Sequence, residues 1–282
     1  MDTFKRSKTK SMIAWAVAAA LSIVYLFITG IPFLFMVLNS FKKQFEMLQK
    51  GVFQLPSEWY IGNYTEVIEK GFLKYFSNSV VLLIISLTIL LFITACASYP
   101  LSRMKFKLRA VIYGLIIACM SIPIHVTLIP VFKMSTALGI YDTLWALIGP
   151  NVAFTIPISV YILTTFMETI PKEIEESAEI DGCGKFRNFF SIILPLSKAG
   201  LSTLAIYNGT AIWNEFAFAN TLTQSRSAQT LPLAIQAFQG EHSMNIPLVM
   251  SVLVLTVLPM IILFIILQDK LVKGMMAGAV KG

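Results

Sequence analysis

The stretch that determines the fold class is residues 79–99, SVVLLIISLTILLFITACASY, which contains no charged side chain. A helix needs about 20 such residues to cross the hydrocarbon core of a bilayer. Five further stretches reach that length, so the sequence predicts an all-α membrane protein with about six transmembrane helices. The six predicted spans are Met12–Leu38, Ser79–Tyr99, Val111–Phe132, Leu144–Phe166, Gly200–Ala219 and Ile246–Leu267.

The composition supports this assignment to the membrane class. Hydrophobic residues make up 56% of the 282 residues and charged residues only 13%, and the mean hydropathy is +0.75. A soluble domain normally carries about 25% charged residues, so a chain this apolar needs lipid around its outer surface. The net charge of +7 comes from short basic clusters between apolar runs. This distribution differs from a basic patch on a soluble fold and argues against a nucleic-acid partner.

Lys and Arg residues determine the expected orientation, because cytoplasmic loops of membrane proteins carry an excess of them. With the N-terminus inside, the inner segments hold 15 of the 22 basic residues. We therefore expect a cell-membrane protein with both termini in the cytoplasm. The first apolar run exceeds the signal-peptide length of about 7–15 residues, so we expect it to be retained. The expected organisation is a cytoplasmic segment (1–11), a first transmembrane helix (12–38), an outer loop (39–78), a core of five helices (79–268) and a cytoplasmic tail (269–282).

Prolines interrupt the third and fourth predicted spans at Pro123, Pro130, Pro150 and Pro157. Proline removes a backbone donor and kinks a helix. In membrane helices such breaks persist where neighbouring helices or a water-filled cavity satisfy the freed carbonyls. Two adjacent kinked spans therefore indicate either a pathway between the helices or purely structural kinks, and the sequence leaves both interpretations open.

The inner loop between the fourth and fifth spans, residues 169–195, predicts a bent pair of helices. Pro171 suits the start of a helix, where its missing donor costs nothing, and acidic residues follow in the first turns, where the helix dipole favours them. Gly182 suits the left-handed residue that ends a helix. A second helix is predicted from Lys185 to Ile193, ending before Pro195. We call this predicted helix–turn–helix segment the elbow.

The elbow carries Ile174 and Ala178 one helical turn apart, beside an acidic face. A small apolar stripe on an exposed helix can dock into a groove on a soluble partner. The alternative is a helix lying on the membrane surface, but such helices are usually basic where they meet anionic lipid. The acidic face therefore favours docking.

The elbow resembles the EAA loop of permease subunits in binding-protein-dependent ABC importers. The family pattern is Glu-Ala-Ala, three residues, Gly, nine residues, Ile, one residue and Leu-Pro. This chain keeps every spacing, with Glu176-Ser177-Ala178, Gly182, Ile192 and Leu194-Pro195, and departs only in Ser177. The resemblance implies that the elbow couples to an ATPase through Glu176, Ser177, Ala178, Asp181, Gly182, Ile192, Leu194 and Pro195.

Shorter sequence words resemble the carbohydrate branch of that family, especially the maltose-type six-span subunit. They are residues 213–216 (WNEF), 230–232 (TLP) and the end of the chain, 277–282 (AGAVKG). The resemblance implies a type I importer architecture with a sugar substrate, a second permease subunit forming a heterodimer, two cytoplasmic ATPase subunits and an external solute-binding protein. It also implies that the tail from Gly274 inserts between the ATPase subunits and that the outer loop Asn220–Asn245 contacts the binding protein.

Polar residues within the predicted spans are candidates for a substrate pathway. They are His125, Asn151, Asn208, Asn214 and Glu215. Each also has a structural interpretation, because His125 can bond a carbonyl freed by proline, the asparagines can link helices, and Glu215 can act as a headgroup anchor or an interface hydrogen-bond partner.

Three other function classes compete with a sugar importer subunit: a permease for another solute, a stand-alone secondary transporter or channel, and an intramembrane enzyme. A secondary transporter should show inverted repeats or buried charge relays, and neither is visible in the sequence. No Ser/His pair, paired carboxylates or metal-ligand spacing lies within the spans. We therefore expect no catalytic residue, metal or cofactor in this chain, with ATP hydrolysis on separate subunits.

Overall fold

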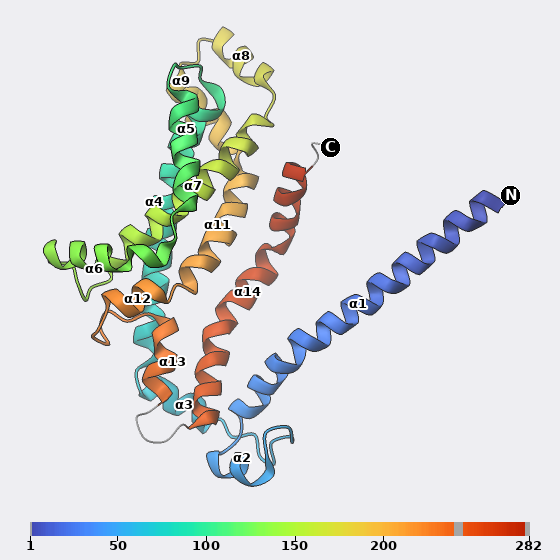
Figure 1. Cartoon of the computed structure of the whole chain (residues 1–282), viewed down its shortest axis with the longest axis vertical. Helices are drawn as coiled ribbons and strands as arrows, with labels where there is room; N and C mark the ends of the chain where they lie inside the picture. The colour runs from blue at the N-terminus through green and yellow to red at the C-terminus, as the bar shows by residue number, and fades with distance from the viewer. Residues whose placement is uncertain (1, 240–244, 280–282) are drawn as a thin grey trace. The chain divides into compact units, whose positions relative to one another are not determined.

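The computed structural model describes the backbone of residues 2–239 and 245–279 and the side chains of residues 14–239 and 245–266. All regular elements within these residues are helical (Figure 1). Among the described residues, four helices are long and apolar enough to cross a membrane. Two further pairs of bent helices bring the number of spans to six if each pair counts as one span. The four helices are Ala14–Ser40, Phe72–Arg103, Trp145–Glu168 and Ile246–Ile266. The predicted all-α membrane class is confirmed.

The chain forms two compact units, and the first combines Met1–Lys70 with Gln236–Leu255. Its helices are α1 (Asp2–Ser40), α2 (Gln44–Lys50), α3 (Gly62–Glu69), the end of α13 (Leu231–Gln239) and the first part of α14 (Ile246–Ala279). The amide of buried Asn63 donates to the carbonyls of Ser40 and Lys42, both at 2.8 Å. These bonds fix the chain where it leaves α1. The expected outer loop 39–78 contains the two short helices α2 and α3.

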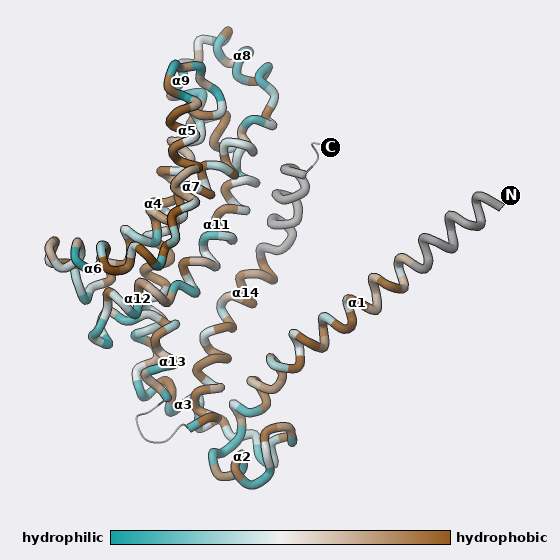
Figure 2. The backbone as a smooth tube through the Cα atoms, in the orientation of Figure 1, coloured by the Kyte–Doolittle hydropathy of each residue, from teal (hydrophilic) through white to brown (hydrophobic). Residues whose placement is uncertain are grey.

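The second unit combines Gly71–Ile235 with Thr256–Gly282. Its further helices are α4 (Phe72–Arg103), α5 (Arg109–Ala118), α6 (Leu128–Ala137), α7 (Trp145–Glu168), α8 (Lys172–Ile180), α9 (Lys185–Asn188), α10 (Leu194–Leu196), α11 (Lys198–Trp213), α12 (Ala217–Leu222) and the start of α13 (Leu231–Gln239). Helix α4 packs along α7, and α11 packs against both. One apolar cluster is centred on Leu147 and Leu222 and a second on Leu163 and Ile193. Figure 2 shows that apolar residues dominate α4 and α7, whereas α8 is largely hydrophilic.

The third predicted span, Val111–Phe132, is not one straight helix. The helical segments on either side of Pro123 meet at an angle of 89°. The residue before a proline is pushed out of the helical region, and Ile122 accordingly has an extended backbone at φ −80° and ψ 116°. Helix α7 in contrast runs unbroken through Pro150 and Pro157, so proline alone did not determine where the chain breaks.

The fifth predicted span, Gly200–Ala219, is also shorter than expected because α11 ends at Trp213. The chain leaves the helix there and begins α12 at Ala217. The carboxylate of Glu215 accepts the N–H groups of Phe218 and Ala219 at 2.7 and 3.0 Å. These donors would otherwise be unsatisfied in the first turn of α12, so Glu215 fixes the start of the new helix.

Candidate functional site

The turn of the elbow is closed by Gly182, whose φ of +80° lies in the left-handed region. The N–H of Gly182 donates to the carbonyl of Glu179 at 3.0 Å, and the N–H of Cys183 donates to that of Ala178 at 2.8 Å. This pair of bonds is the Schellman arrangement that ends a helix on a left-handed residue. The predicted role of Gly182 as the end of the first elbow helix is confirmed.

The second half of the elbow differs from the single α-helix predicted from Lys185 to Ile193. The short helix α9 passes at Phe189 into a π-helical turn, Phe189–Ile193, and α10 then continues through Pro195 to Leu196. In a π turn the backbone hydrogen bonds join residues five apart instead of four, and this one ends at Ile193, two residues before Pro195. Ile192 and Leu194 are half-buried and Pro195 is exposed.

The elbow presents apolar side chains at its surface. Ile180 at the end of α8 is 86% exposed, and Phe186 in α9 is 80% exposed. Ala178 instead turns inward and is only 9% exposed. The remaining predicted coupling residues of the first helix and its turn are exposed, namely Glu176, Ser177, Asp181 and Gly182. The accessible surface of the elbow therefore carries acidic side chains beside the largely exposed Ile180 and Phe186.

A buried ion pair that was not predicted from the sequence attaches α8 to the rest of the second unit. Nε of Arg103, at the end of α4, lies 2.9 Å from Oε1 of Glu175, and these side chains are 4% and 14% exposed. Asn188 of α9 donates to the other oxygen of Glu175 at 3.3 Å. Burial raises the pKa of the Glu175 carboxyl, and the charge of Arg103 opposes that shift. The sequence signal for this ion pair was a basic residue just after a predicted span, together with an acidic inner loop.

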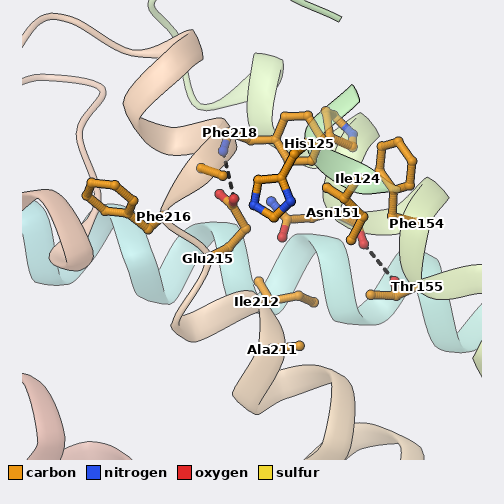
Figure 3. A pocket seen from close by; sticks show the side chains of 12 residues that line it. Ile124, His125, Asn151, Phe154, Thr155, Ala211, Ile212, Glu215, Phe216 and Phe218 are labelled. Carbon is orange, nitrogen blue, oxygen red and sulfur yellow. Dashed lines mark hydrogen bonds between the residues drawn. The ribbon is translucent and has the colours of Figure 1, made fainter. Parts of the chain in front are cut away.

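A cavity of about 370 Å³ lies in the second unit (Figure 3). It gathers three of the five candidate pathway residues, His125, Asn151 and Glu215, which line it together. The stacked rings of Phe154 and Phe218, with centroids 5.5 Å apart, form part of its wall. The cavity thus combines polar groups with an aromatic surface.

The other two candidate pathway residues lie elsewhere. The amide of Asn208, which is buried, donates to the hydroxyl of Ser159 at 2.9 Å and so links α11 to α7. The amide of Asn214 is exposed and donates to the carbonyl of Thr210 at 2.9 Å within its own helix end. Neither residue lines the cavity.

The segment between α12 and α13 is fixed from two sides. The carboxylate of Asp142 accepts the N–H groups of Gln224 and Ser225 at 2.7 and 2.8 Å. The amide of Asn78 donates to the carbonyls of Ser227 and Gln229 at 2.9 and 2.7 Å. This part of the expected outer loop is therefore ordered by polar contacts with residues far away in the sequence.

Comparison with known proteins identifies the family. The model of the binding-protein-dependent transport system inner membrane component matches residues 89–277. A protein of Caldicellulosiruptor sp. (strain Rt8B.4) that carries the name ABC transporter permease protein ORF2 is 50% identical over 92% of this chain and 94% of its own length. The melibiose/raffinose/stachyose import permease protein of Bacillus subtilis is 33% identical over 99% of this chain and all of its own length.

A solved structure shares the fold. A chain of a bacterial ABC transporter involved in the import of the acidic polysaccharide alginate superposes with a TM-score of 0.78 at 20% identity, covering 92% of this chain and 97% of that one. This likeness supports the type I importer architecture for the described helices. The chain therefore belongs to the family of inner membrane components of binding-protein-dependent transport systems, the permease subunits of ABC importers.

Proposed function

We propose that this chain is the membrane-spanning permease subunit of an ATP-driven importer for a sugar or oligosaccharide. It forms half of the translocation pathway, beside a second permease subunit, and works with two cytoplasmic ATPase subunits and an external solute-binding protein. Full-length similarity to an import permease for melibiose, raffinose and stachyose supports the substrate class. The observation that carries the coupling role is the elbow, which presents Ile180 and Phe186 to solvent beside an acidic surface.

The exposed surface of the elbow fits a groove on an ATPase subunit. Burying one large apolar side chain contributes about 1.5–3 kcal/mol, so Ile180 and Phe186 together supply a substantial part of a docking energy. Glu176 and Asp181 lie on the same accessible surface, where they offer charge partners to basic residues of the ATPase. The inward position of Ala178 assigns it to packing within the chain, which keeps the helix close to its own unit.

Reconstitution tests this proposal directly. The complete importer is placed in proteoliposomes, and ATP hydrolysis and uptake of labelled raffinose are measured with the binding protein present. We expect uptake to require ATP and the ATPase subunits. Uptake that persists without those subunits would contradict an ATP-driven mechanism, and stimulation by a binding protein loaded with amino acid but not with sugar would contradict the substrate class.

We propose the cavity lined by His125, Asn151 and Glu215 as part of the substrate pathway. Sugars combine hydroxyl groups with apolar faces, and the cavity offers polar groups beside the aromatic wall of Phe154 and Phe218. His125→Ala should therefore lower sugar uptake. Asn214→Ala is a matched control, because Asn214 is polar and adjacent in sequence to Glu215 but lies outside the cavity. Equal uptake by the two variants would remove the cavity from the pathway.

We further propose that the elbow and both termini lie in the cytoplasm and that the loop Asn220–Asn245 meets the binding protein outside. The polar contacts that order residues 224–229 support a preformed docking surface. Residues 240–244 of this loop and the side chains of the tail from Gly274 lie outside the described residues. Reporter fusions within Arg103–Arg109 should read as cytoplasmic, and an external signal there would overturn this topology.

A further inference from the structure

The end of α4 reaches both the end of α7 and the elbow through one side chain, that of Arg103. Its Nε faces the Glu175 carboxylate of α8 at 2.9 Å. Its terminal Nη2 donates to the carbonyl of Met167 at 2.6 Å and to the carbonyl of Ile170 at 2.7 Å. Met167 lies in the last turn of α7, and Ile170 lies in the link from α7 to α8. The guanidinium group thus bridges α4, the end of α7 and the elbow.

The geometry of arginine suits this set of contacts. The guanidinium group is planar and carries five N–H donors in a fixed fork, whereas lysine offers a single point charge on a flexible stem. The carbonyls at the end of a helix have no partner within the helix, and a cation there also interacts favourably with the helix dipole. Arg103 satisfies such carbonyls on one side while it pairs with Glu175 on the other.

Stability alone does not explain why this pair is buried. A buried ion pair contributes little to net stability, because desolvation of both charges offsets their attraction, yet removing one partner is strongly destabilising. Burial raises the pKa of Glu175, and the charge of Arg103 opposes that shift, the direction expected for a carboxylate that burial desolvates. A contact of this kind fixes geometry more than it adds stability.

We propose that Arg103 and Glu175 are positioning residues that fasten α8 to the ends of α4 and α7, so that the elbow moves with these helices as one body. The proposal rests on the coupling role of the elbow proposed above. A movement imposed on α8 then reaches two membrane helices at once through the ion pair. Without the ion pair, the covalent link of Thr169–Pro171 still joins α8 to α7, and movement of α8 is absorbed locally.

Hydrogen exchange tests the attachment without any partner protein. The full chain is placed in lipid nanodiscs, and exchange of the α8 amides is compared between Glu175→Ala and Glu173→Ala, which removes an exposed acid from the same turn. We expect about tenfold faster exchange for Glu175→Ala, equivalent to ~1.4 kcal/mol. Glu175→Gln keeps an acceptor for Arg103 and should recover part of the protection. Equal exchange in the Glu175→Ala and Glu173→Ala variants would overturn the attachment, whatever the elbow does in coupling.

The coupling measurement uses the complete importer in proteoliposomes. The number of ATP molecules hydrolysed per sugar taken in should rise for Glu175→Ala and Arg103→Lys, and stay at the wild-type value for Glu173→Ala. A variant that only lowered the amount of folded complex would reduce hydrolysis and uptake together and leave this ratio unchanged. Faster α8 exchange with an unchanged ratio would overturn the transmission of movement by the ion pair. The coupling role of the elbow is tested separately, through Gly182.

Discussion

Replacement of Gly182 by valine perturbs the elbow at a single backbone angle. Gly182 adopts φ +80°, and a Cβ added there would meet no atom within 4 Å. The penalty is therefore conformational and not steric. A left-handed conformation costs an L-residue roughly 1–2 kcal/mol, and β-branched residues fit it least well. The native bend of the elbow should accordingly be less populated by about 5- to 30-fold.

Two matched variants isolate this effect. Gly184→Val introduces the same side chain two residues later, where φ is −69° and ψ is 160° and a Cβ again meets no atom within 4 Å. Valine suits that extended conformation, so this variant should behave as wild type. Gly182→Asn keeps the site of the change but uses a residue that tolerates the left-handed region, and it should cost less than valine.

The assay measures ATP hydrolysis and labelled sugar uptake by the complete importer in proteoliposomes. We expect Gly182→Val to lower uptake per ATP while membrane insertion of the chain remains normal. Uptake per ATP should be lowest with valine at position 182, higher with asparagine and highest with the wild-type glycine. Equal uptake per ATP in Gly182→Val and Gly184→Val would show that the left-handed bend has no part in coupling.

Further predictions concern the outer loop and the tail. Asp142→Ala should speed exchange of the Gln224 and Ser225 amides about fivefold, since each loses a hydrogen bond that contributes ~1 kcal/mol, and unchanged exchange would contradict this role of Asp142. Although burial opposes it, the N–H groups of Gln224 and Ser225 lower the pKa of Asp142. Its stabilising contribution should therefore be complete above about pH 3.9 and be lost as the pH falls through the lowered pKa. Hydrogen exchange of the loop amides measures this loss. The Asp142→Asn variant should show no such pH dependence. Deletion of the tail from Gly274 should weaken co-purification of the ATPase subunits, and undiminished recovery would remove that role.

Local features of this chain could be predicted because their causes are local. Apolar runs long enough to cross a bilayer predicted the helical membrane class, and the structure provides helices of that length. Gly182 was predicted as the left-handed end of a helix from its place after good helix formers, and its φ of +80° confirms this. The EAA spacing from Glu176 to Pro195 led to the family, since it is a pattern along one short segment.

Helix breaks were predicted less well. Pro123, Pro150 and Pro157 look alike in the sequence, yet only the first lies at a break in the backbone. The end of α11 at Trp213 was not visible either, because no proline or glycine marks it. It depends on Glu215 accepting the first N–H groups of α12, which requires the chain to turn there.

The sequence alone determined that this chain spans a membrane and carries an ABC permease elbow, because hydrophobic length and motif spacing are properties of neighbouring residues. Which polar residues meet depended on tertiary packing. It brought Arg103 to Glu175 and Asp142 to Gln224, and it separated Asn208 and Asn214 from the cavity that His125 shares with Glu215. Such contacts join segments far apart in the chain, and they depend on how the helices pack.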